Sequence, residues 1–355
     1  MTTRQASLIV LLAVLAAGPA KAADMPVTVR EPDNSGWSLQ LDNDLFSPRN
    51  HDRDYTGGVS LTFAGKRVTG WPLSLDPALD RLNDWLQRRE PTSPLTLHSL
   101  QIGMLAFAPD EISNAQLIAD DRPYASLIYW ANSRLTLNTD GETADEQTLL
   151  LGILGTHIAE NIQKTIHHVT GSTPPQGWQH QISDGGEPTF RYSLSRQRLL
   201  DQGLFGRHPW QLKRAIEGSL GMVTETNLAM SLRWGRLRTP WWSNTPEWTE
   251  YFSQPTPGLS PAEWRGPPEF YLWAGVKARA RLYNAFLQGQ FQPSELRYHL
   301  DEMRPLIGEA WFGITRQTGD HSRLSWVLRY QGSELRHGHG DRDVMWGSFI
   351  YNRDY

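Results

Sequence analysis

Apolar and polar side chains alternate along short segments throughout the chain, and glycine, proline, aspartate and asparagine separate these segments. Segments 37–41, 59–63, 270–281 and 323–330 show the alternation most clearly. A period of two residues places successive side chains on opposite faces of a β-strand, and one apolar face suits contact with lipid. The pattern therefore predicts an all-β fold, a transmembrane antiparallel β-barrel.

The alternation predicts twelve strands and a single domain over residues 23–355, because no repeat of fixed period, low-complexity tract or linker interrupts it. If both chain ends face the periplasm, the connections after the first, third and fifth strands lie outside the cell. The Trp- and Pro-rich stretch 237–268 would then be periplasmic, where turns are usually short. The expected strands are 36–45, 56–65, 97–107, 124–138, 145–155, 188–200, 211–223, 226–236, 269–283, 303–317, 321–335 and 343–355.

The N-terminal residues predict export. Arg4, the apolar run 8–17 and the small residues around Lys21 form the pattern of a cleavable secretory signal over residues 1–22. The apolar run is shorter than the roughly 20 residues that a membrane-spanning helix needs. The chain has no cysteine, which excludes a lipoprotein and a disulfide scaffold.

The C-terminus and the composition indicate the outer membrane. Phe349, Tyr351 and the last residue, Tyr355, share one face, which resembles the signal that barrel-assembly machinery uses for insertion. Fifteen Trp and eleven Tyr suit the aromatic girdles of a membrane barrel, although a Trp-rich soluble sandwich would share this composition. Loss of Arg4 and Lys21 with the signal leaves 32 basic against 38 acidic residues, which argues against nucleic acid as a partner.

The connection after the fifth strand contains the one convincing helix, residues 156–171. Its apolar stripe consists of Ile158, Ile162 and Ile166. Gln163 and His167, also four residues apart, form a neighbouring polar stripe. We expect the apolar stripe to lie against the barrel, so that Gln163 and His167 are presented at the barrel wall.

A histidine in this position is a candidate general base, because imidazole accepts a proton near neutral pH. The alternative for His167 is a solvated helix histidine. His168 is its local rival, and His157 and His180 are weaker candidates. The sequence argues against a zinc site, since no His-Glu-x-x-His or similar ligand spacing occurs.

Two further clusters carry acidic residues. Asp42-Asn43-Asp44 ends the first strand and offers hard oxygen ligands to calcium, with Asp44 and Asn43 as the favoured pair; the alternative is an ordinary turn. The cluster around Arg122, residues 120–126, enters the fourth strand. Its Asp-Arg pair echoes the pair at 52–53 and would pin loops to the barrel rim, with Tyr124 in the interfacial belt. Arg122 could instead meet an anionic phosphate.

Taken in order, these motifs resemble those of a known family. The set comprises Asn43-Asp44, Asp-Arg-x-Tyr-Thr-x-Gly at 52–58, Asp-Arg-Pro-Tyr-Ala at 121–125, Gln163-x-x-x-His167 and Gly-Trp-Gln-x-Gln-Ile at 177–182. In this order the chain resembles the outer-membrane lipid A 3′-O-deacylases of the LpxR type over nearly the whole mature length.

That resemblance implies a calcium-dependent hydrolase with its site between the barrel wall and an extracellular helix. His167 would activate water with help from Gln163, and Asp44 with nearby backbone oxygens would hold Ca²⁺. Asn43 and Thr56 would hydrogen bond the developing oxyanion. The implied substrate is lipid A of lipopolysaccharide in the outer leaflet, which loses a 3′-linked acyloxyacyl chain, and a monomer is expected.

The sequence departs from the family pattern at two places. Family members carry a lysine after the third strand that is thought to contact the sugar phosphate, but residues 107–121 contain no lysine or arginine. An acidic residue that follows the catalytic histidine is matched only by Thr173, with Asp184 or Glu187 as distant substitutes. These departures bear on the exact lipid substrate more than on the hydrolytic chemistry.

Two other functions compete with this interpretation. An outer-membrane phospholipase would need a serine beside a histidine on the barrel exterior, and Ser193 and Ser195 lack such a neighbour in sequence. Thr56 as nucleophile is a variant of the favoured site. A non-enzymatic channel or surface-binding barrel could be lined by Lys277, Arg279 and Arg281, unless these cations pair with acids such as Glu309.

Overall fold

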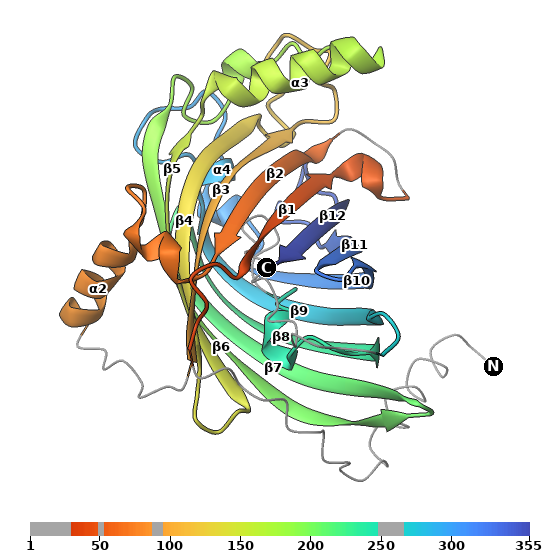
Figure 1. Ribbon diagram of the computed structural model, residues 1–355. Helices are drawn as coiled ribbons and strands as arrows, with labels where there is room; N and C mark the ends of the chain where they lie inside the picture. Colours follow the sequence, from red (N-terminus) through yellow and green to blue (C-terminus); the bar gives the residue numbers. More distant parts are fainter. Residues whose placement is uncertain (1–29, 49–52, 87–94, 248–265) are drawn as a thin grey trace.

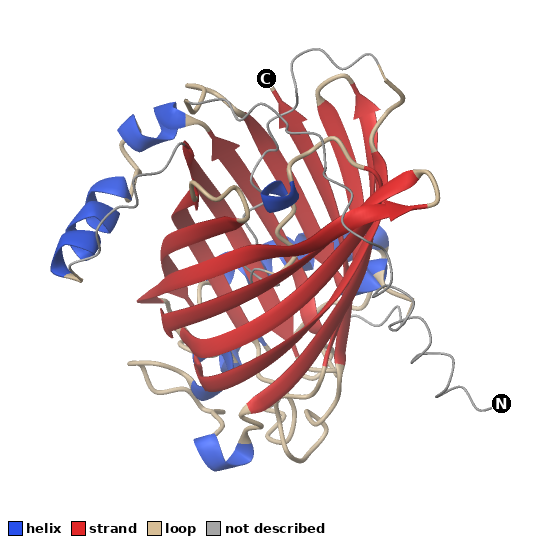
Figure 2. Ribbon diagram, turned by 90° about the horizontal axis from the view of Figure 1, so that it is seen from below, coloured by secondary structure: helices blue, strands red, loops and turns tan. Residues whose placement is uncertain are grey.

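The computed structural model describes residues 30–48, 53–86, 95–247 and 266–355. Over these residues the chain forms a closed antiparallel barrel in which neighbouring strands follow one another in sequence and the first pairs with the last (Figure 1). The perpendicular view in Figure 2 shows a wall of tilted strands with helices outside it and at its ends. The strands are β1 (Gly36–Asn43), β2 (Asp54–Ala64), β3 (Leu95–Ala108), β4 (Ala125–Leu137), β5 (Thr143–Leu154), β6 (Glu187–Phe205), β7 (His208–Gly221), β8 (Val223–Arg236), β9 (Phe270–Asn284), β10 (Leu306–Gly319), β11 (Ser322–Gln331) and β12 (Val344–Asp354).

The predicted strand pattern is confirmed, since each of the twelve expected segments overlaps one observed strand. The predicted helix is also present, as α3 (His157–Thr170). The predicted signal sequence 1–22 lies outside the described residues, as does part of the connection 237–268. In the part of the chain that the structure describes, no helix is both long and apolar enough to cross a membrane.

Strand β9 shows how the alternation divides the two sides of the wall. Phe270, Val276 and Leu282 are exposed on its outer face, while Lys277 and Arg279 are buried on its inner face. The outer face is apolar because its side chains contact lipid. The inner face can be polar because its charged side chains form ion pairs with other side chains in the lumen.

The inward cations pair with acids. The sequence analysis had offered this pairing as the alternative to a channel lined by charges. Lys277 Nζ lies 3.0 Å from Glu309 Oε2, and Arg279 also pairs with Glu309. Arg281 Nε lies 2.7 Å from Glu225 Oε2. These groups are almost completely buried, so each charge depends on its partners for compensation.

Connecting segments enter the lumen at both ends. The Trp- and Pro-rich connection after β8, which the sequence placed in the periplasm, folds inward at Trp241 and Trp242. These rings pack with Leu97 and Leu135 on the inner faces of β3 and β4. At the other end, Phe286 of the short helix α4 (Ala285–Gln288) packs in the same core cluster as inward side chains of the strands.

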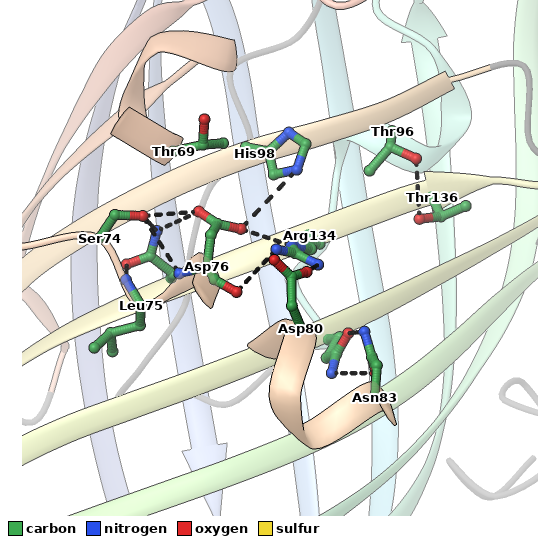
Figure 3. A network of polar contacts seen from close by, with 12 residues as sticks. Thr69, Ser74, Leu75, Asp76, Asp80, Asn83, Thr96, His98, Arg134 and Thr136 are labelled. Carbon is green, nitrogen blue, oxygen red and sulfur yellow. Dashed lines mark hydrogen bonds and ion pairs between the residues drawn. The ribbon is translucent and has the colours of Figure 1, made fainter. Parts of the chain in front are cut away.

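A helix that the sequence analysis missed, α2 (Asp76–Trp85), lies outside the wall. Its Asp76 accepts hydrogen bonds from Arg134 Nε at 2.6 Å and from Asn132 Nδ2 at 3.1 Å, both on the outer face of β4 (Figure 3). Asn83 on the same helix hydrogen bonds Gln147 of β5 at 2.8 Å. Because α2 covers these polar side chains, they do not face lipid unpaired.

Candidate functional site

Helix α3 lies against the outer face of the barrel wall, over the end of β3 and the start of β4 (Figure 1). Ala159 of α3 packs with Ala106 and Ala108, which alternate on β3 with lumen-facing Phe107. Gln163 and His167 follow Ala159 at four-residue spacing and are each only 6% exposed. The predicted presentation of Gln163 and His167 at the barrel wall is therefore observed.

The expected orientation of the isoleucine stripe was wrong. Ile158, Ile162 and Ile166 are 51%, 41% and 54% exposed, so the apolar stripe points away from the barrel. The wall side of α3 is instead formed by the small residue Ala159 and the two polar residues of the site. Small side chains on both surfaces let the helix approach the strands closely, which encloses Gln163 and His167.

The orientation of the Gln163 amide is fixed by Trp178. The indole Nε1 donates to Gln163 Oε1 at 2.8 Å, and Trp178 itself is completely buried. The ring of Tyr124 packs on Trp178 at a centroid distance of 4.7 Å. Tyr124, expected in the interfacial belt, is therefore part of the packing behind the site. Because Oε1 is the acceptor, Nε2 is the end of the amide that donates, and it is buried without a hydrogen-bond partner in the described part of the chain.

The orientation of His167 is fixed by the chain that follows the helix. Gly171 adopts a left-handed conformation with φ of 71° and ends α3, and the chain then turns back. This turn brings the main-chain carbonyl oxygen of Thr173 to 2.5 Å from His167 Nδ1. A carbonyl oxygen only accepts, so Nδ1 carries the proton in the neutral ring and Nε2 is the basic nitrogen.

The second half of the site lies at the ends of β1 and β2. Asn43 Nδ2 donates to the main-chain oxygen of Thr56 at 2.6 Å, and Asn43 Oδ1 accepts from the N–H of Leu45 at 2.8 Å. The latter bond caps the 3-10 helix η2 (Asp44–Phe46). The two sequence clusters at 43–44 and 56 are thus joined by the side chain of Asn43.

Strand β3 connects the two halves. Gly57 of β2 pairs with Ala106, the residue that contacts α3. A Cβ on Gly57 would lie 3.4 Å from Asn43 Nδ2, so the asparagine amide lies beside Gly57 on the wall. The residues of the predicted site therefore gather on the outer wall around the ends of three adjacent strands and the helix that covers them.

The acidic residues of the first cluster have different surroundings. Asp42 points into the lumen, where it accepts a hydrogen bond from Tyr55 Oη at 2.8 Å. Asp44 lies in η2, is buried, and accepts from the N–H of Arg53 at 2.6 Å. Asp44, the carboxylate that the sequence favoured as a metal ligand, therefore belongs to the half of the site at the ends of β1 and β2, whereas Asp42 does not.

A cation bound at Asp44 would have a single carboxylate ligand. Within the described ranges, no group of three or more His, Cys, Asp or Glu side chains is placed to hold a metal. A cation at Asp44 would therefore take its remaining ligands from neutral oxygens, which calcium accepts readily. The hydroxyl oxygen of Thr56 is one such buried oxygen, and no described residue hydrogen bonds it.

Arg122 lies in the rim of the barrel mouth. Its Nε is 3.4 Å from Asp54 and its NH2 group is 3.5 Å from Glu334, and all three side chains are buried. The guanidinium also lies 5.4 Å from the centre of the Phe107 ring, on the lumen side of β3. Contact with a substrate phosphate would require Arg122 to leave both carboxylates, so this geometry favours the predicted role in pinning loops.

Arg342, in the connection before β12, extends this rim cluster. Its NH2 group lies 2.9 Å from Asp54, and its NH1 group donates to Asp121 at 2.6 Å. Burial lowers the pKa of Arg342, but the charges of Asp54 and Asp121 outweigh it and hold the pKa above its ordinary value.

The rival residues lie elsewhere or have other partners. His168 is exposed on α3, and His157 and His180 pair with Glu160 and Glu295. Ser193 and Ser195 share the inward face of β6 with Arg191, which hydrogen bonds Glu217 in the lumen. A serine nucleophile on the barrel exterior therefore finds no support from these two residues.

The proposed acidic substitutes near His167 are also engaged elsewhere. Asp184 accepts a hydrogen bond from Gln181, and Glu187 accepts from the main-chain N–H groups of Phe291 and Gln292. The orienting contact on His167 Nδ1 comes from the main chain of Thr173. Sequence patterns could place Thr173 near the histidine but could not reveal that its carbonyl, and not its side chain, makes the contact.

The closed wall with an apolar outer face and a polar site upon it defines an outer-membrane barrel. The family model described as outer membrane protein LpxR matches residues 8–355, and the chain belongs to this family of outer-membrane proteins. The predicted family and location are thereby confirmed. None of the curated protein sequences compared with the chain matches it.

Solved structures agree on the fold. LpxR from Salmonella typhimurium superimposes with a TM-score of 0.69 at 15% identity, covering 90% of this chain and 100% of that one. The β domain of the Bordetella autotransporter BrkA gives a TM-score of 0.39 at 8% identity, covering 91% of this chain and all of the other. Only the first of these similarities is high enough to support the shared architecture.

Proposed function

We propose that this protein is a hydrolase that removes the 3′-linked acyloxyacyl chain from lipid A. The observation that carries the proposal is His167, which α3 encloses against the outer wall and which the Thr173 carbonyl holds with Nε2 as its basic nitrogen. A general base enclosed on the lipid-facing side of an outer-membrane barrel suits an ester in the adjacent leaflet. Membership of the LpxR family supports the same substrate class.

The arrangement supports direct attack by water. The water oxygen bonds to the ester carbonyl carbon while His167 Nε2 takes the proton. The bond from that carbon to the sugar oxygen then breaks, and His167 returns the proton to the departing oxygen. The products are a free carboxylic acid and a sugar hydroxyl group.

The remaining site residues assist this attack. Gln163 helps His167, because its Nε2, which the bond to Trp178 leaves as a fixed donor, can hydrogen bond the oxygen of the attacking water. The negative charge that develops on the carbonyl oxygen is stabilised by other groups. Asn43 and Thr56 offer further hydrogen bonds from the strand side of the site. Calcium, held by Asp44 with neutral oxygens, would act as a Lewis acid on the ester carbonyl.

Thr56 as nucleophile is a variant of this proposal. Its hydroxyl oxygen is buried without a hydrogen-bond partner among the described residues. Attack by Thr56 would leave the acyl chain covalently on the protein before hydrolysis, whereas attack by water would not. The mass of the intact protein after rapid quenching separates the two pathways.

The activity is tested by mass spectrometry of lipid A from cells that express the wild type or His167→Ala. His168→Ala is the matched control, because His168 is the exposed neighbour on the same helix. We expect loss of the acyloxyacyl unit with the wild type and the control, and a decrease of about 10²–10⁴-fold with His167→Ala. Unchanged lipid A in cells whose outer membrane contains the folded wild-type barrel would refute the proposal for this substrate.

A parallel experiment on purified protein tests the expected cofactor and assembly. We expect deacylation to stop on calcium chelation and to return on calcium addition, and the protein to act as a monomer inserted by the barrel-assembly machinery. Deacylation rates in detergent solution test the calcium requirement, and a calibrated size determination in the same detergent tests the monomer. Depletion of the assembly machinery, followed by fractionation of membranes, covers the insertion pathway.

A further inference from the structure

Helix α3 has three distinct faces. The wall face carries Ala159, Gln163 and His167, which are buried. At 100° per residue, the isoleucine face is centred about 100° from the wall face on one side. The polar face is centred about 120° from the wall face on the other side. The isoleucine face comprises Ile158, Ile162, Ile166 and Val169, of which Val169 is 79% exposed.

The polar face is charged and internally paired. Lys164 Nζ donates to Glu160 at 2.5 Å, and His157 lies 2.8 Å from the same carboxylate. Partial burial raises the pKa of Glu160, but its hydrogen bonds with Lys164 and His157 hold the pKa below its ordinary value. This face therefore remains ionised and suits water, while the isoleucine face does not.

The order of the three faces is the order expected for a helix that lies along a barrel at a membrane surface. Protein lies on one side, an apolar face follows, and a charged face completes the circle. A helix surrounded by water would gain nothing from four exposed aliphatic side chains on one stripe. The hydroxyl of Thr165, near the border of the apolar and polar faces, donates to the carbonyl of Asn161 at 2.7 Å and is thereby satisfied within the helix.

The height of the exposed wall bears independently on where α3 lies relative to the membrane. On β9 the outward apolar run from Phe270 to Leu282 is uncovered. At about 3.4 Å per residue and a tilt of about 40°, this run spans about 30 Å across the membrane, enough for an apolar band of about 25 Å.

On β3 the uncovered wall is much shorter. The outward residue Leu100 is completely buried where the 3-10 helix η3 (Lys66–Gly70) packs on β3, and Ala106 is buried under α3. The stretch between them spans only about 15 Å across the membrane by the same geometry. The band is therefore short by about 10 Å, and a helix with its side chains is about 10–12 Å wide.

We propose that α3 is immersed in the outer leaflet, where its isoleucine face contacts lipid acyl chains and completes the apolar band of the barrel. The exposed side chains Ile102 of β3 and Ile153 of β5 belong to that same band. A lipid then reaches His167 laterally, from the leaflet beneath the helix, without passing through water. Lateral access of the lipid rests on the proposed function, whereas the immersion of the helix does not.

Single nitroxide labels test the immersion, because the chain has no native cysteine. Ile162→Cys and Ile166→Cys report on the isoleucine face, and Asn161→Cys and Lys164→Cys are the controls on the polar face. Val276→Cys, on the outer wall of β9, gives the reference for a lipid-facing position. Protein is reconstituted in phosphatidylcholine vesicles, and collision rates with oxygen and with a water-soluble nickel chelate are measured for each label.

We expect labels at 162 and 166 to collide with oxygen more than with nickel, as at 276, and the two controls to show the reverse. Equal accessibility of all four helix positions to nickel would overturn the proposal. Dipolar broadening between labels at 162 or 166 would also overturn it, since a second copy of the chain would then cover the stripe. Circular dichroism and heat-modifiable gel mobility establish that each variant is folded.

A second experiment tests lateral access of the lipid. Ile162→Ser is compared with Thr165→Ser, which alters the same helix without removing an aliphatic group from the isoleucine face. We expect deacylation of lipid A in bilayers to fall about tenfold for Ile162→Ser, the equivalent of about 1.4 kcal/mol, and to change little in mixed detergent micelles. Equal losses in bilayers and micelles would refute lateral access. If the wild type had no activity, the proposed function would fail while the labelling result would still decide the immersion.

Discussion

The imidazole of His167 and the main-chain carbonyl of Thr173 form a 2.5 Å hydrogen bond through Nδ1. Thr173 stands where related chains are expected to carry an acidic residue, so a backbone group here performs the orienting role that a carboxylate could perform. A neutral acceptor fixes the ring and its tautomer without adding a negative charge beside the imidazole.

This contact predicts that the Thr173 side chain is dispensable. Thr173→Ala keeps the carbonyl and should retain activity within about twofold, since surface substitutions that preserve such a contact change free energies by about 0.5 kcal/mol or less. Initial rates of lipid A deacylation provide the measurement. A loss approaching that of His167→Ala would show that the threonine hydroxyl itself takes part.

Trp178→Phe should impair catalysis without unfolding the barrel. The substitution removes the indole N–H that orients Gln163 and keeps an aromatic ring against Tyr124. We expect about a tenfold decrease in kcat, corresponding to one hydrogen bond of about 1 kcal/mol or slightly more. In the double variant with Gln163→Ala the two effects should not add, because both act on the same amide.

Trp85→Phe is the matched control, since Trp85 is a largely exposed residue at the end of α2. It should leave kcat unchanged. Additive effects in the double variant, or a decrease in thermal stability as large as the decrease in rate, would indicate that Trp178 only packs.

Asp44→Asn should abolish stabilisation by calcium. A ligand that binds only the folded state stabilises it by about 2.7 kcal/mol at 100 times its Kd, which raises the melting temperature. We expect calcium to raise the melting temperature of the wild type and of Asp42→Asn, whose carboxylate lies in the lumen. Asp44→Asn should show no such shift. An equal response of all three proteins would place calcium elsewhere.

Arg122→Gln should affect stability more than substrate binding. Arg122 is buried between Asp54 and Glu334, and its loss leaves two buried carboxylates without this partner. We expect destabilisation of about 3 kcal/mol with an unchanged KM for lipid A. A selective rise in KM for phosphorylated lipid A, with unaltered stability, would support the alternative role in phosphate binding.

Glu309→Gln tests the structural role of the charges in the lumen. Lys277, Arg279 and Arg329 all pair with this carboxylate, so its removal leaves buried cations poorly compensated. We expect destabilisation of about 3–5 kcal/mol in urea unfolding from detergent. Wild-type protein in planar bilayers should show no steady conductance, because connecting segments enter the lumen at both ends and the inward cations are paired with acids. Steady open channels would instead favour a transport function.

The helix α2 shows where local patterns were insufficient. Its contacts with Asn132 and Arg134 join residues more than 50 positions apart in sequence, and its buried face mixes Leu79 with polar Asp76 and Asn83. Local helix signals are present, since Pro77 lies in the first turn and leucines recur at helical spacing at 75, 79, 82 and 86, but they do not indicate what the helix packs against. Its position depends on polar side chains of the outer wall, which only the folded barrel brings together.

The sequence by itself determined the number and order of the strands, because alternation with a period of two is a local consequence of strand geometry. It also located α3 and placed Gln163 and His167 on one face, since both follow from the helical period. The tertiary structure decided which face of α3 meets the wall. On the outer surface of a membrane barrel, an apolar side chain can pack favourably against either protein or lipid. An isoleucine stripe alone therefore does not tell which of the two it contacts. The bond from Trp178 to Gln163 and the bond from His167 to Thr173 likewise depend on how the chain turns after α3.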